Sequence, residues 1–161
     1  MRSIIVTPKP GPGYIIREKG VHNLKKILAE VKSWSDDNQY DFYEKSRKNK
    51  PKGIGHKLEL KWLLERKITE FIRFNIEINY VVLDLVPTGE DLVSGSLEVT
   101  IEAEVIIDYQ DQWAGSKFKN FLLDLYENIF YKGTIDRYKD KLDAEVKELR
   151  DVIKDILEFH K

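Results

Sequence analysis

The most constraining feature of the sequence is an alternation of apolar and polar residues between Leu97 and Tyr109. Apolar side chains occupy the odd positions, and acidic residues occupy most of the even ones. A period of two indicates a β-strand with one apolar and one polar face. At about 3.3 Å per residue this strand spans about 43 Å. It therefore needs neighbouring strands along its edges and a cover on its apolar side.

Two further segments show the same period, at the even positions from Leu58 to Leu64 and from Ile72 to Val82. We expect them to be neighbouring antiparallel strands. Residues 39–47 are ambiguous between strand and helix, and their aromatic density favours a hairpin strand whose turn contains the Lys-Gly pair at 52–53. These segments together predict a meander of about four long strands.

The strand register follows from which residues must share the apolar face. Apolar positions are even-numbered in 72–82 and odd-numbered in 97–109. Centring the turn between Glu90 and Asp91 places Ile76 opposite Val105. It also places Arg73 opposite Asp108 on the polar face. Around 81–86 the alternation gives way to a nearly continuous apolar run, which indicates a bulge or a stretch buried on both sides.

Three helices are expected outside the meander. Asn23 can cap the first, whose apolar stripe ends near Trp34. Ser116 can cap the second, which ends near Gly133. Thr134 can cap the last helix, which carries Ile135, Tyr138, Leu142, Val146, Leu149, Ile153, Ile156 and Leu157 on one side.

The last helix, about 37 Å long at about 1.5 Å per residue, matches the longest strand in length. We therefore expect a single α+β domain over 1–161 in which the N-terminal helix and the two C-terminal helices cover one sheet face. Residues 1–13, rich in proline and glycine, are expected to form an extended arm, and residues 14–17 are expected to form a short edge strand. This element order resembles the helix-grip architecture of START-like domains, although it has fewer long strands, an extra helix and no shared motif.

Composition limits the function classes. The 27 basic and 28 acidic residues leave a net charge of −1, so an anionic partner would need a local cationic patch. The absence of cysteine excludes disulfides and thiolate chemistry, and it fits a cytoplasmic location. We expect no transmembrane segment or signal peptide. The abundance of lysine, glutamate and isoleucine is typical of thermophilic proteins.

Two groups of residues are candidates for binding. The first consists of aromatic residues that could line an apolar ligand pocket between sheet and helices, although such stripes are more often plain core: Trp62, Phe74, Tyr80, Tyr109, Trp113, Phe121 and Tyr138. The second consists of the cations of a hairpin tip, which could contact phosphates or simply keep an edge strand solvated: Lys45, Arg47, Lys48, Lys50, Lys52 and Lys57.

The acidic side of the sheet is a third candidate surface, formed by Glu77, Glu98, Glu102, Glu104 and Asp108. Carboxylates at this spacing could hold Mg²⁺ or Ca²⁺. Lys61, Lys67 and Arg73 are expected to pair with them, which favours an ordinary solvated face. Leu63 and Ile106 would form a small apolar spot on it. The sequence contains no catalytic, cofactor or metal-binding motif that we recognise.

We therefore interpret the chain as a non-catalytic binding or assembly module, whose partner is another protein or a second copy of itself. One alternative is a carrier of a small hydrophobic ligand, held in a cavity of several hundred Å³ between sheet and helices. Another is contact with nucleic acid or an anionic surface through the cationic hairpin.

Overall fold

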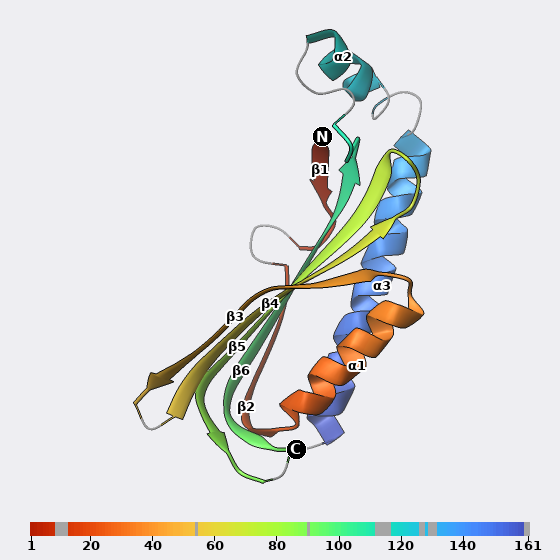
Figure 1. Ribbon diagram of the computed structural model, residues 1–161. Helices are drawn as coiled ribbons and strands as arrows, with labels where there is room; N and C mark the ends of the chain where they lie inside the picture. The colour runs from red at the N-terminus through yellow and green to blue at the C-terminus, as the bar shows by residue number, and fades with distance from the viewer. Residues whose placement is uncertain are drawn as a thin grey trace.

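The computed structural model describes residues 1–8, 13–53, 55–89, 91–111, 117–125, 128 and 132–159. These residues confirm the α+β class, with an antiparallel sheet packed against helices on one face (Figure 1). The described sheet has six strands, where we expected about four. In chain order the elements are β1 (Arg2–Ile5), β2 (Tyr14–His22), α1 (Leu24–Asp37), β3 (Asp41–Lys52), β4 (Gly55–Lys67), β5 (Ile72–Pro87), β6 (Val93–Ile107), α2 (Lys117–Leu125) and α3 (Lys132–Phe159).

The four strands after α1 form the predicted meander, and the hairpin interpretation of residues 39–47 is confirmed by β3 and β4. The sheet order is β1-β6-β5-β4-β3, and β2 also pairs with β6. β1 and β2 follow one another along the same edge of β6, since Ile5 is opposite Glu104 and Tyr14 is opposite Ile101. Residues 2–5 of the expected extended arm pair with β6 as β1, and their isoleucines favour a strand. Residues 9–12 of the arm lie outside the described part of the chain.

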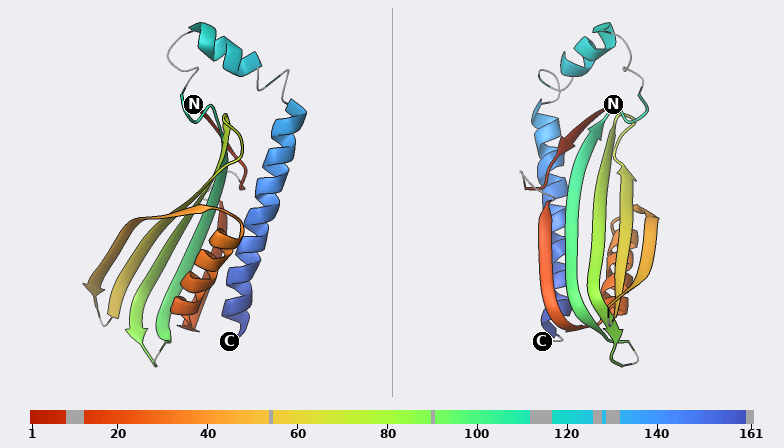
Figure 2. Two further views of the ribbon diagram at one scale, coloured as in Figure 1. Left: turned by 45° about the vertical axis from the view of Figure 1, so that its right-hand side comes forward. Right: turned by 90° about the vertical axis from the view of Figure 1, so that its left-hand side faces the viewer.

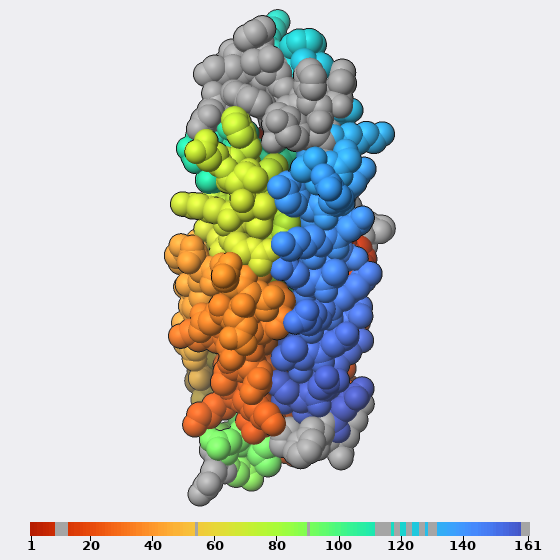
Figure 3. Space-filling model, turned by 90° about the vertical axis from the view of Figure 1, so that its right-hand side faces the viewer, coloured from red at the N-terminus to blue at the C-terminus, as the bar shows by residue number. Residues whose placement is uncertain are grey.

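The helix layer consists of α1 and α3, which lie side by side across one sheet face (Figures 1 and 3). The expected third covering helix is not part of this layer, because α2 lies beyond the end of the sheet (Figure 2). Phe121 of α2 is accordingly exposed. We call the sheet face opposite α1 and α3 the open face, and it faces the viewer in the right-hand view of Figure 2.

The apolar positions of the alternating strands point toward α1 and α3, as the sequence predicted. Val99, Ile101 and Val105 of β6 have no exposed surface. The apolar stripe of α3 packs against the same core, and its fully buried members are Leu142, Val146, Leu149 and Ile153. Burying such aliphatic side chains contributes about 1.5–3 kcal/mol each relative to exposure. The sheet and the helix layer are therefore held together by one apolar core.

The register between β5 and β6 differs from our prediction by two residues. Ile76 is opposite Ala103 rather than Val105, and Arg73 is opposite Ile106. Each residue keeps the predicted face, because a shift by two preserves the period of the strand. The alternation thus determined the faces correctly and the partners incorrectly.

The turn and the predicted bulge each contribute one residue to the shift. Pro87 is opposite Val93, so the turn is centred on residue 90 rather than between residues 90 and 91. The bulge adds the second residue. It lies between Leu83 and Val86, where two residues of β5 oppose the single Gly95 of β6. Asp84, inside the bulge, has a positive φ of 55°. A Cβ on Gly95 would lie 2.7 Å from the Leu83 carbonyl oxygen, so the two backbones approach closely here.

The ends of the helices follow local capping in part. The Asn23 side chain accepts a hydrogen bond from the Lys26 N–H at 3.0 Å, which confirms the predicted N-cap of α1. The helix continues past Trp34 to Asp37, one turn further than expected. It does so because the Asn38 side chain donates to the Trp34 carbonyl and closes the last turn.

The predicted boundary between α2 and α3 was wrong. α3 begins at Lys132, so Gly133 and Thr134 lie within its first turn instead of ending one helix and capping the next. The predicted cap Ser116 lies outside the described residues. Among the helices of the described ranges, none has the length and hydropathy of a membrane span.

Candidate functional site

Three of the predicted aromatic pocket residues, Trp62, Phe74 and Tyr80, are buried in the core. The rings of Trp62 and Tyr80 meet edge to face at 5.1 Å, and Phe74 meets Tyr138 of α3 at 6.0 Å. Tyr109 lies past the end of β6, with the Arg73 guanidinium 5.5 Å from its ring centroid.

The other two aromatic candidates are not brought into this arrangement. Phe121 is 58% exposed on α2, and Trp113 lies outside the described residues. A ligand carrier therefore stays a prediction that these contacts do not test.

The cationic candidates gather on the β3–β4 hairpin, which projects away from the helix layer (Figures 1 and 2). Arg47 pairs with Glu44 at 2.9 Å, and Lys57 pairs with Glu59 at 2.9 Å. The hydrogen bond from Lys57 and its charge lower the pKa of the Glu59 carboxyl. The remaining cations of this group, Lys45, Lys48, Lys50 and Lys52, are exposed along β3.

The acidic residues of β5 and β6, Glu77, Glu98, Glu102 and Glu104, lie on the open face as predicted. The prediction was wrong for Asp108, which follows the end of β6 with a φ of 56° and is 1% exposed. Lys61 pairs with Glu77 at 3.1 Å, and Arg17 of β2 pairs with Glu98 at 2.9 Å. Arg73 was also expected to pair with these acids. It donates to the side-chain oxygen of Asn75 and lies 4.0 Å from the Glu65 carboxylate. The predicted apolar spot is mostly covered, since Ile106 is 3% exposed. Within the described ranges, no three histidine or acidic side chains come together in a way that could hold a metal ion.

The two edges of the sheet differ in how well they are protected. β3 forms one edge, and it carries a bulge between Glu44 and Ser46, Pro51 near its end and a row of lysines. These are common devices against the pairing of edge strands. β2 lies at the other edge and pairs with β6 in a continuous register over nine residues, without a proline. None of the described residues pairs with the outer side of β2.

The backbone groups on this outer side can be assigned from the hydrogen-bonding pattern. The Val6 N–H donates to the Ala103 carbonyl at 2.9 Å, and the Ala103 N–H donates to the Thr7 hydroxyl at 3.3 Å, so both groups of Ala103 point toward this edge. In antiparallel pairs this orientation alternates along the strand. With the observed register, the residues of β2 whose N–H and C=O groups point away from β6 are Ile15, Arg17, Lys19 and Val21.

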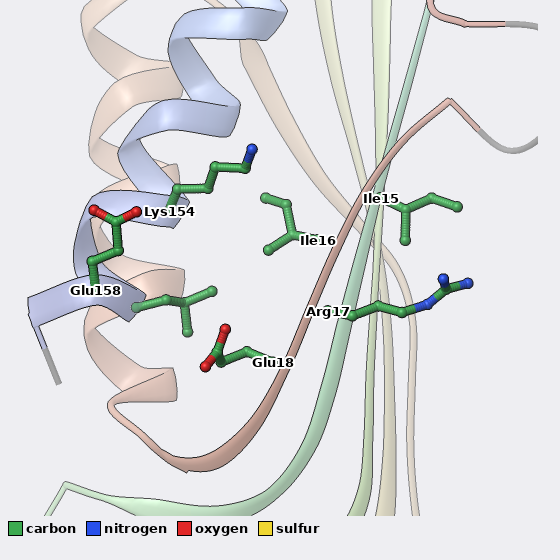
Figure 4. A pocket seen from close by; sticks show the side chains of 7 residues that line it. Ile15, Ile16, Arg17, Glu18, Lys154 and Glu158 are labelled. Carbon is green, nitrogen blue, oxygen red and sulfur yellow. The ribbon is translucent and has the colours of Figure 1, made fainter. Parts of the chain in front are cut away.

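A groove of about 290 Å³ lies beside this edge, between β2 and the end of α3. We call it the edge groove, and its lining residues are Ile15, Ile16, Arg17, Glu18, Lys154, Leu157 and Glu158. Figure 4 shows Ile16 and Glu18 pointing toward α3, and Ile15 and Arg17 pointing to the other side. Lys154 extends from α3 toward the strand, and Glu158 lies along α3.

The edge groove has an apolar floor and charged walls. Ile16 and Leu157 are each 5% exposed and belong to the core. On the open face, the Arg17 side chain remains 70% exposed although it pairs with Glu98. Exposed backbone donors and acceptors beside a partly apolar groove can bind an extended chain by main-chain hydrogen bonds.

Sequence reasoning did not single out the edge groove. It predicted a short edge strand over 14–17, whereas β2 extends to His22. Gly20, with a φ of 124°, and the charged residues before it obscure the alternation.

Comparison of the chain with protein-family models, with curated proteins and with solved structures finds no match.

Proposed function

We propose that this protein is a non-catalytic polypeptide-binding module whose partner adds as an extended strand to the outer edge of β2. The observation that carries the proposal is a continuous nine-residue edge with outward N–H and C=O groups, of which those of Ile15 and Arg17 lie beside the edge groove. In strand addition, main-chain hydrogen bonds provide affinity, and pockets for alternate side chains provide specificity.

The position of α3 supports this mode of binding. Alternate residues of an added strand point to opposite faces of the sheet. Those opposite Ile16 and Glu18 would point toward α3 and enter the groove, where Leu157 provides apolar contact. Those opposite Ile15 and Arg17 would lie on the open face. An added strand would thus be held on its α3 side as well as along its backbone.

The contrast between the two edges supports β2 as the binding edge. The bulge at Glu44–Ser46 and the lysine side chains hinder pairing along β3. Pro51 also lacks an N–H group to donate. Since β2 carries neither a bulge nor a proline, a partner strand meets fewer obstacles there.

Replacement of Lys19 by proline tests the proposal. The Lys19 N–H points away from β6, so Lys19→Pro removes a donor for the partner and leaves the β2–β6 hydrogen bonds in place. Lys19→Ala is the matched control, because it removes the same side chain and keeps the N–H. We would titrate each protein with a capped octapeptide of alternating valine and threonine and follow the backbone amides by NMR.

We expect amide shifts along β2 and at residues 154–158 in the wild type and in Lys19→Ala, and their loss in Lys19→Pro. Shifts confined to β3, or equal binding by Lys19→Pro, would contradict the proposal. Light scattering of the free protein tests a second copy as the occupant. A dimer that Lys19→Pro dissociates would support strand addition and identify the partner as the same chain.

A second candidate function is contact with a polyanion through the β3–β4 hairpin. The observation in its favour is the exposed row of Lys48, Lys50 and Lys52 on a projecting element. Binding to DNA or heparin should then weaken steeply with salt, because phosphate or sulfate contacts release counterions. Replacing these three lysines by glutamate should abolish it, whereas unchanged binding would exclude this surface.

A further inference from the structure

We infer that the strand accepted by β2 belongs to another polypeptide, with acidic side chains toward the open face and an aliphatic side chain toward α3. The inference rests on the proposed strand addition and specifies the chemistry of its partner. It follows from the charges on the two sides of the edge.

The open-face side of β2 is cationic. The row that points there consists of Ile15, Arg17, Lys19 and Val21, which contains two cations and no acid. A residue directly opposite Arg17 on an added strand would share the open face, with its Cα about 5.5 Å from that of Arg17. Oppositely charged side chains in such cross-strand pairs are favourable. The open face therefore favours acids opposite both cations.

The inner neighbour of β2 already shows this pairing. Glu98 of β6 lies directly opposite Arg17, and the two side chains form an ion pair at 2.9 Å. Lys19 is opposite Ser96, which brings no charge. An acid opposite Lys19 on the outer side would thus give Lys19 a cross-strand carboxylate. An acid opposite Arg17 would place Arg17 between two carboxylates, that of the partner strand and that of Glu98. The partner strand would repeat the alternation of apolar and acidic residues that β6 presents.

The α3 side of the groove has the opposite preference. Of the charged groove residues that the structure describes, Glu18, Glu158 and Lys154 line this side, whereas Arg17 points to the open face. An acid pointing to this side would approach two carboxylates, which is unfavourable. Ile16 and Leu157 form the apolar contact there, which suits a valine or isoleucine. Acids are therefore expected only on the open-face positions of the partner.

A second copy of β2 fits this edge poorly. In a symmetric antiparallel pair with shared faces, a register centred on Glu18 sets Arg17 opposite Lys19. A register centred on Arg17 sets Arg17 opposite its own copy, and one centred on Lys19 sets Lys19 opposite its own copy. Registers centred nearer to either end of Tyr14–His22 avoid such pairs but join a shorter part of the strand. Like charges directly opposite one another destabilise a strand pair. The charges therefore favour a different chain.

Three capped octapeptides test the inference. The acidic probe is Val-Thr-Glu-Thr-Glu-Val-Val-Thr, which in an antiparallel arrangement sets its acids opposite Lys19 and Arg17. The other two replace both glutamates by lysine or by glutamine. At low salt we expect the acidic probe to bind about tenfold tighter than the basic one, with the neutral probe between them. Added salt should narrow the difference, because the charges are exposed.

Lys19→Glu gives an independent readout, since Lys19 forms no ion pair with the residues that the structure describes. The acidic probe should lose affinity for this variant, and the basic probe should gain it. Equal binding of all three probes, or tighter binding of the basic one, would overturn the charge preference and leave strand addition standing. Failure of all three probes to shift the β2 amides would contradict strand addition itself.

Discussion

The guanidinium of Arg66 on β4 and the carboxylate of Glu145 on α3 lie 2.9 Å apart, and each side chain is 14% exposed. The same guanidinium donates to the Asn38 carbonyl at 2.7 Å, and the Tyr40 hydroxyl donates to the Glu145 carboxylate at 2.8 Å. Asn38 and Tyr40 follow the end of α1. One ion pair therefore joins the sheet, the end of α1 and the long helix that forms a wall of the edge groove.

Replacing Arg66 by methionine should destabilise the fold by about 2–4 kcal/mol, because it leaves the Glu145 carboxylate nearly buried without its cation. Urea unfolding followed by circular dichroism measures the change. Lys61→Met is the control, since Lys61 and Glu77 are 46% and 42% exposed and such pairs are worth about 0–1 kcal/mol. If Arg66→Met lowers the free energy of unfolding no more than Lys61→Met does, the Arg66–Glu145 ion pair does not hold the layers together.

Removing the hydroxyl of a buried tyrosine should destabilise the fold at Tyr40 but not at Tyr80. Tyr40→Phe removes a hydrogen bond to a charged acceptor and should cost about 1.5–3 kcal/mol. Tyr80 is fully buried, and its hydroxyl has no hydrogen-bond partner among the described residues. Tyr80→Phe should therefore be neutral or stabilising by about 1 kcal/mol. Urea midpoints of both variants test this, and a large loss for Tyr80→Phe would reveal a polar partner.

Stability should fall at alkaline pH because of the same two residues. Burial raises the pKa of both the Tyr40 and the Tyr80 phenols above the ordinary value of about 10. Below pH 10 both are protonated in the folded and the unfolded chain, and their contribution is complete. Above pH 10 they ionise only on unfolding, so each lowers stability by up to about 1.4 kcal/mol per pH unit.

Unfolding in urea between pH 8 and pH 12, with phenolate absorbance as the second signal, measures this slope. Tyr80→Phe should reduce the slope of the unfolding free energy against pH. Lysines also titrate in this range, and comparison with the wild type cancels their contribution because both proteins contain the same lysines. An identical slope in the two proteins would show that Tyr80 ionises within the folded chain.

The parts of the fold that were predictable depend on neighbours in sequence. The Asn23 cap and the faces of β5 and β6 follow from local pattern, and both are confirmed. The register was not predictable, because it depends on where the turn is centred and on the exact site of the bulge, and Asp84 is a residue type that does not demand a positive φ. The length of β2 was missed because its partner β6 is distant in the sequence.

The candidate site was harder to predict than the fold for a physical reason. Its distinguishing groups are main-chain N–H and C=O groups of residues such as Arg17 and Lys19, which every residue type except proline possesses in full. Composition and motif therefore give no signal for them. What identifies them is the edge position of β2 and the adjacent end of α3, and both follow from contacts between distant parts of the chain.

The bulge between β5 and β6 should tolerate no side chain at Gly95. A Cβ there would lie 2.7 Å from the Leu83 carbonyl oxygen and 3.1 Å from a methyl group of Val82. Gly95→Ala is therefore expected to cost about 1–3 kcal/mol, since backbone would have to move. Gly89→Ala is the control, because its nearest neighbour would be a side-chain carbon at 3.9 Å. Equal unfolding midpoints would mean that the bulge relaxes without cost.

The lysines of β3 should protect its edge from pairing with other copies. Exposed lysines along an edge strand hinder association, because pairing two such strands brings like charges together. Replacing Lys45, Lys48, Lys50 and Lys52 by threonine, which favours strands, removes that repulsion while leaving the backbone unchanged.

We expect the fourfold variant to form oligomers whose mass rises with protein concentration in light scattering. The wild type at the same concentrations is the reference, and Lys19→Ala in β2 is the control for loss of a lysine at the other edge. A variant that scatters as the wild type does would show that the bulge and Pro51 alone keep the β3 edge unpaired. Contact with an anionic partner would then be the remaining proposed role of these lysines.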